Sequence, residues 1–161
     1  FKRRQTGSFL PTFFHELSHA MVALCTFHRV GDLRAGWSSG GRVTIYGGTN
    51  WLILVAPYCL GLAPLFAALF VSVGPDEWRQ ASLCGFGAAV AFYGFGLLSD
   101  VHAKQTDLQS VGLPFAWCFL PSANLLVLGM LLAGTVEGAE SLSTFFNEVL
   151  RVTQMGIDRF L

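Results

Sequence analysis

Three long uncharged segments limit what this chain can fold into. Residues 51–73, 81–98 and 111–134 contain no Asp, Glu, Lys or Arg. Each is close to the roughly 20 residues that an α-helix needs to cross a hydrocarbon layer about 30 Å thick. Residues 8–27 form a fourth apolar segment, in which Glu16 is the only charged side chain. The sequence therefore predicts a bundle of about four transmembrane helices.

Composition and charge support this prediction and exclude one class of partner. Hydrophobic residues make up 53% of the chain and charged residues 12%, which is more apolar surface than one small water-soluble core can bury. Ten Lys and Arg balance ten Asp and Glu, so there is no basic field to attract nucleic acid.

Uninterrupted apolar runs favour spanning helices over barrel strands. We predict an all-α integral membrane protein, multi-pass, in a bacterial inner or an organellar membrane. Its expected partners are the lipid bilayer and a membrane-protein substrate or partner subunits.

The connecting segments are short and polar, and without a linker or repeat residues 1–161 are predicted to form a single domain. The longest connector, 28–50, holds a β-forming stretch between two glycine pairs, which predicts a short strand or hairpin after the first helix. This stretch consists of Arg42, Val43, Thr44, Ile45 and Tyr46. Residues 140–161 mix apolar and charged side chains as an amphipathic helix does, either on the membrane surface or on a partner.

The chemistry is concentrated in a His-Glu-x-x-His motif formed by His15, Glu16 and His19. Positions four apart on a helix differ by about 40° in azimuth and about 6 Å along the axis, so both imidazoles can bind one metal ion. Glu16 is then a candidate general base. Ionisable groups inside a membrane are costly and usually serve a site or a partner. The alternative is a polar cluster that links helices by hydrogen bonds.

A catalytic zinc site needs a third protein ligand and an open position for water. The clustered candidates are Asp100, His102 and Asp107, between the third and fourth apolar segments. Two crossings separate the end of the first helix from this segment, so both are expected at the same membrane face. Each candidate also has a structural interpretation, as a loop cap, a solvated histidine or a helix cap. The residues alone leave the choice between Asp100 and Asp107 open.

Several stretches resemble a known family. HELSHAMVALCTFHRV, followed by a glycine-flanked strand and APYCLGLAPLFAAL, is similar to the site-2-protease-type membrane zinc metalloproteases, in particular their compact bacterial members. TDLQSVGLPFAW resembles a later element in which an Asp precedes a Gly-x-Pro turn into the last helix. The resemblance covers about residues 9–125. The Asn-Pro-rich stretch that leads to Asp-Gly in better-known members does not occur in this sequence.

The resemblance implies an intramembrane zinc metalloprotease that hydrolyses peptide bonds of membrane-associated substrates. It makes His15 and His19 zinc ligands, Glu16 the catalytic base and Asp107 the third ligand. A Zn²⁺-activated water would attack the scissile carbonyl while Glu16 transfers its proton to the leaving amine. Asn124, in the fourth segment, is either a polar partner for the reacting carbonyl or an interhelical hydrogen-bonding residue.

A helical substrate must unwind before its carbonyls can be attacked. The strand at 42–46 is expected either to pair with the unwound segment by β-augmentation or to pack as a simple loop hairpin. A second interpretation, from a different class, is a non-proteolytic or accessory membrane subunit that retains a protease-like zinc site. Its Phe-rich faces and C-terminal amphipathic helix would then be contact surfaces.

Overall fold

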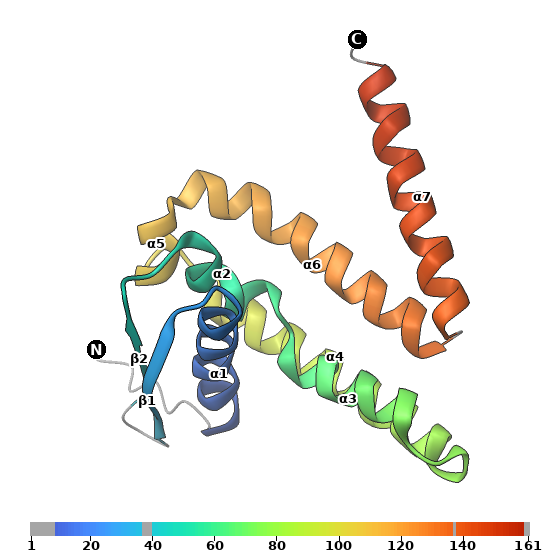
Figure 1. Cartoon of the computed structure of the whole chain (residues 1–161), viewed down its shortest axis with the longest axis horizontal. Coiled ribbons are helices and arrows are strands. Elements are labelled where there is room, and N and C mark those ends of the chain that lie inside the picture. The colour runs from blue at the N-terminus through green and yellow to red at the C-terminus, as the bar shows by residue number, and fades with distance from the viewer. Residues whose placement is uncertain (1–8, 37–39, 137, 160–161) are drawn as a thin grey trace.

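The computed structural model describes residues 9–36, 40–136 and 138–159. Within them the chain forms a series of helices interrupted by one β-hairpin (Figure 1). The elements in order are α1 (Phe9–Cys25), β1 (Arg29–Gly36), β2 (Gly40–Tyr46), α2 (Trp51–Cys59), α3 (Leu62–Val73), a short 3₁₀ helix (Asp76–Trp78), α4 (Arg79–Asp100), α5 (Thr106–Val111), α6 (Leu113–Val136) and α7 (Ala139–Asp158).

Two helices among the described residues are long and apolar enough to cross a membrane, Asp76–Asp100 and Leu113–Val136. They contain most of the predicted spans at 81–98 and 111–134. The predicted span at 51–73 is instead a pair of helices bent by 65°, which counts as a third span only if the pair is taken as one. Helix α1, within predicted span 8–27, has 17 residues and is not among these candidates. The count of four spans is therefore not confirmed.

The bend between α2 and α3 has a local cause. The backbone of Leu60 (ψ 89°) and Gly61 (ψ 84°) leaves the helical region. Pro64 lies in the first turn of α3, where its missing N–H costs no hydrogen bond. A Cβ at Gly61 would lie 2.8 Å from Pro64 Cγ, so a larger residue at this corner would force its neighbours to shift. The bend lets α2 pack against α1, α5 and α6 while α3 runs along α4.

The predicted strand at 42–46 is confirmed as part of β2, the second strand of an antiparallel hairpin. Its register runs from Arg29 opposite Tyr46 to Gly36 opposite Gly40, with an irregularity between Val30 and Leu33. The chain turns back after α1 at Phe27, whose φ of 61° is left-handed. Both strands consequently lie against α1, as Figure 1 shows.

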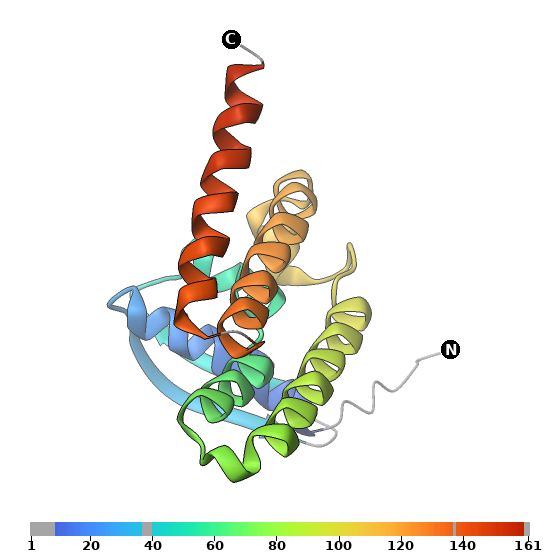
Figure 2. The same cartoon turned by 90° about the vertical axis from the view of Figure 1, so that its right-hand side faces the viewer.

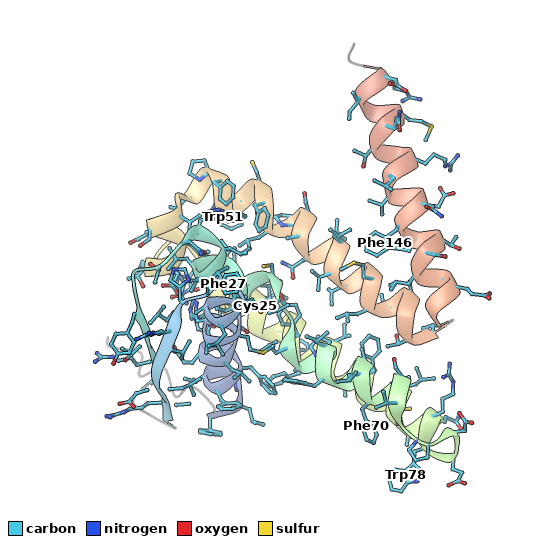
Figure 3. All side chains as sticks on the ribbon, in the orientation of Figure 1. Cys25, Phe27, Trp51, Phe70, Trp78 and Phe146 are labelled. Atoms are coloured by element: carbon cyan, nitrogen blue, oxygen red, sulfur yellow. The ribbon has the colours of Figure 1, made fainter. Side chains whose placement is uncertain are left out.

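A buried core joins three helices at the end of the molecule that carries the β1–β2 hairpin. Its buried members come from α2, α5 and α6 and comprise Val55, Tyr58, Leu108, Ala116 and Leu120. Elsewhere large apolar side chains face outward, with Phe95, Leu98 and Leu125 at least 76% exposed. Figure 3 shows Phe70 and Trp78 extending away from the α3–α4 pair. Such exposure suits a lipid environment, since a water-soluble protein rarely exposes apolar patches this large.

The C-terminal segment predicted at 140–161 forms α7 over Ala139–Asp158, and its last two residues lie outside the described part of the chain. Helix α7 begins against α6, where a Cβ at Gly129 would lie 2.7 Å from the Phe145 ring. It then projects away from the other helices (Figure 2). Apolar side chains such as Leu150 and Ile157 are exposed along it.

Candidate metal centre

Helix α1 presents the two motif histidines one turn apart on one side. Their ring centroids are 5.0 Å apart. His19 is buried, and its Nδ1 lies 2.7 Å from the backbone carbonyl oxygen of Ile53 in α2. A carbonyl only accepts hydrogen bonds, so Nδ1 carries the proton and Nε2 keeps its lone pair. This contact prepares His19 Nε2 as a metal ligand.

Asp107 in the first turn of α5 completes a three-residue cluster. Its Oδ2 lies 3.5 Å from His19 Nε2 and 3.8 Å from His15 Nε2. Candidate ligand atoms of all three residues lie within 4.8 Å of one another. The neighbouring His15 and His19 imidazoles hold the pKa of the Asp107 carboxyl well below its usual range, which favours the ionised form that a metal ligand needs.

The donor set fits zinc. Two imidazoles and one carboxylate are a known protein ligand set of catalytic zinc. Ligand atoms on one tetrahedral zinc, with bonds of about 2.0–2.1 Å, lie about 3.3 Å apart. The separations of Asp107 Oδ2 from His15 and His19 approach this value. These three residues can therefore hold one Zn²⁺ and leave a fourth position for water.

Tyr58 is part of the centre although sequence reasoning missed it. Its side chain is 1% exposed, its hydroxyl donates to Asp107 Oδ2 at 3.5 Å, and its ring meets the His15 ring edge-on at 5.4 Å. In the sequence it is one aromatic residue within an apolar run, so no local signal distinguished it. Its hydroxyl matters only because α2 and α5 pack together.

Glu16 lies next to the cluster but outside the ligand set. The backbone of Val43 in β2 interacts with its carboxylate. A Cβ at Gly41 would lie 2.6 Å from Glu16 Oε1, so β2 approaches this carboxylate closely where glycine has no side chain. The candidate base is thus held between α1 and the hairpin.

The other residues of the predicted substrate strand lie in different surroundings. Arg42 and Thr44 border a surface hollow together with Asp32 and Arg34 of β1. Ile45 and Tyr46 pair with the beginning of β1. Val43 differs from these four residues because its backbone interacts with the Glu16 carboxylate.

The structure leaves the two other third-ligand candidates outside the cluster. Asp100 ends α4, and its Oδ1 accepts from the Ser99 hydroxyl at 3.3 Å. His102 Nδ1 accepts from the backbone N–H of Lys104 at 3.3 Å. The metal-capable group found among the described residues contains neither of them. The geometry therefore favours Asp107 over both.

Asn124 links helices. Its Nδ2 donates to the carbonyl oxygens of Tyr58 and Leu120 at 2.8 Å each, and its Oδ1 accepts from the Tyr93 hydroxyl at 2.7 Å. The side chain thereby joins α6 to α2 and α4. The structure places Asn124 in the interhelical role, with its amide engaged by the protein itself.

The comparison with protein families assigns the chain to a family. The family model for peptidase M50B-like proteins matches residues 5–143, and so spans the histidines, the hairpin and Asp107. The chain belongs to the peptidase M50B-like family. Membership in this M50B family confirms the resemblance to site-2-protease-type membrane metalloproteases and supports peptidase activity. With its apolar helices, it also indicates a membrane protein. The searches of curated proteins and of solved structures returned no match.

Proposed function

We propose that this M50B-like protein is a multi-pass intramembrane zinc metalloprotease that hydrolyses peptide bonds of membrane-associated substrates. The observation that carries the proposal is the convergence of His15, His19 and Asp107 from two separate helices. Glu16 lies beside them without joining the ligand set. This division between ligands and base is what a water-activating zinc site requires.

Bound zinc supplies a water that is acidic near neutral pH and polarises the scissile carbonyl. Glu16 accepts a proton at its carboxylate and returns it to the leaving nitrogen. Ile53 fixes the tautomer of His19 through its carbonyl. Tyr58 holds the Asp107 carboxylate in place. Each of these tasks belongs to a residue that the structure brings to the centre.

Strand β2 is suited to receive substrate. A transmembrane substrate hides its carbonyls in helical hydrogen bonds and must become extended before cleavage. In the described residues β2 belongs to a two-stranded sheet, and the backbone of its Val43 reaches Glu16. An extended substrate segment pairing with this hairpin would pass close to the candidate base.

The deciding experiment compares wild type with Glu16→Gln. We expect about one zinc per chain in both proteins, because Glu16 is not a ligand. Cleavage of a transmembrane peptide by the variant should fall by about 10² or more, the usual contribution of a general base. Glu77→Gln, at the exposed 3₁₀ helix, is the matched control. Unchanged cleavage by Glu16→Gln would remove the mechanism.

The alternative of an accessory, non-proteolytic subunit is favoured by the exposed apolar side chains of α7, which include Phe146 and Met155. This function predicts bound zinc without cleavage and purification in fixed ratio with a larger complex. The same pair of measurements, zinc content and peptide cleavage, separates it from the protease.

A further inference from the structure

A small, partly open cavity of about 50 Å³ adjoins the metal centre. Residues of α1, α2, α3 and α4 line it. His15 and Tyr58 belong both to its wall and to the metal centre. A group bound in this cavity would therefore lie directly beside a metal ion or substrate at the candidate zinc site.

The wall favours an apolar occupant. It contains three hydroxyl groups, and each hydrogen is already donated within the protein. Ser18 donates to the Phe14 carbonyl at 2.7 Å. Tyr93 donates to Asn124 Oδ1 at 2.7 Å, and Tyr58 donates to Asp107. The remaining wall is mostly proline, phenylalanine, leucine and alanine, and the His15 imidazole and the Asp100 carboxylate are its other polar groups. Away from these two groups, a polar side chain entering the cavity would lose water without gaining equivalent hydrogen bonds.

The volume limits the size of the occupant. At about 50 Å³ the cavity is small, although it is only partly enclosed. It therefore suits an aliphatic side chain of a few carbons better than a large aromatic ring.

We propose that this cavity is a specificity pocket for the substrate residue next to the scissile bond, and that it selects small to medium aliphatic side chains. The proposal rests on the proposed protease function and names a property of its substrates. Two facts support this occupant, namely the two residues that the cavity shares with the metal centre and the apolar wall that it offers.

Gly96 provides a way to fill the pocket. It lines the cavity from α4, and a Cβ added there would meet no atom of other elements within 4 Å. Gly96→Leu therefore adds a side chain at the wall of the cavity without a clash at its Cβ. Gly94, two residues away on the same helix, is also half-buried with open space around it but does not line the cavity. Gly94→Leu is the matched control.

The test measures binding rather than turnover. The probes are short peptide hydroxamates, which chelate zinc, differing only in the side chain next to the hydroxamate: Gly, Ala, Leu or Trp. For zinc-loaded wild type we expect affinity to rise by about 10-fold or more from Gly to Leu, as a filled hydrophobic pocket gives, and to fall for Trp. Gly96→Leu should lose this gain while retaining zinc and affinity for the Gly probe. Gly94→Leu should behave as wild type.

The outcomes separate the two proposals. Equal affinities for all probes in wild type, or a Leu preference that persists in Gly96→Leu, would overturn the pocket while leaving the protease function intact. Equal affinities for all probes, combined with slower cleavage by Gly96→Leu, would also overturn the specificity pocket. That result would indicate that water occupies the cavity. Absence of zinc from the wild-type protein would overturn the protease function and, with it, the pocket.

Discussion

Tyr58 and Asp107 are 49 positions apart, yet the tyrosine hydroxyl donates to the same carboxylate oxygen that faces both histidines. The contact joins α2 to α5 at the candidate metal centre. Groups that orient a metal ligand typically change metal affinity by 10–100-fold when removed. In the proposed zinc site, Tyr58 would therefore be a positioning residue for Asp107.

Tyr58→Phe should weaken zinc binding by about 10–100-fold, because Asp107 loses its hydrogen bond while the ring still fills the core. A chelator competition titration measures this change. Tyr93→Phe is the matched control, since its hydroxyl contacts Asn124 instead of Asp107. Zinc affinity that falls equally in both variants would assign Tyr58 a general packing role.

Asp107→Ala should lose most bound zinc, whereas Asp100→Ala should keep it. The first change leaves two imidazoles to hold the metal, and the second removes a carboxylate that the structure pairs with Ser99. Metal analysis of detergent-purified, folded protein measures the occupancy. The reverse pattern would transfer the ligand role to Asp100, and full occupancy in both variants would direct attention to His102.

His15→Ala and His19→Ala should each reduce zinc from about one per chain to a small fraction, because a catalytic site has only three protein ligands. Chelation of wild-type protein should abolish peptide cleavage, and added Zn²⁺ should restore it. His28→Ala is the control, since His28 interacts with Thr26 away from the cluster. Stoichiometric zinc in a double variant lacking His15 and His19 would rule out this centre.

Gly41→Ala should impair cleavage by about 10-fold or more without loss of zinc. The added methyl group would fall 2.6 Å from Glu16 Oε1, so either the base or β2 must move. Zinc is retained because Glu16 is not in the ligand set. Gly87→Ala, in open space on α4, serves as the control. Normal cleavage by Gly41→Ala would show that contact between β2 and the base is dispensable.

The sequence predicted local features well because they depend on local geometry. Helical spacing alone brings His15 and His19 together, and glycine pairs around a β-forming stretch indicate the hairpin. Asp107 is different, because its distance to the histidines depends on how α5 docks. Buried Leu108 and the left-handed Gly112 (φ 100°) fix that docking. The residues alone therefore could not decide between Asp100 and Asp107.

The number of spans was harder to predict because a run of apolar residues does not reveal where a helix breaks. Two residues, Leu60 and Gly61, divide the segment at 51–73 into α2 and α3. The role of Tyr58 was hidden for the same reason, since this break lets α2 turn toward α1 and α5. Asn124 was recognised as polar within a span, but its partners come from tertiary packing.

The break between α2 and α3 also gives a reason for the Asn124 side-chain amide within the apolar helix α6. In an unbroken helix the carbonyl of Tyr58 would accept from the N–H of Leu62. At the corner it accepts from Asn124 Nδ2 instead. A carbonyl oxygen without a hydrogen-bond donor in hydrocarbon costs several kcal/mol. The hydrogen bond from Asn124 offsets a cost of this order. A straight helix over 51–73 would remove this acceptor and leave Asn124 only its partners in α4 and α6, so the corner gives the amide its one contact with α2.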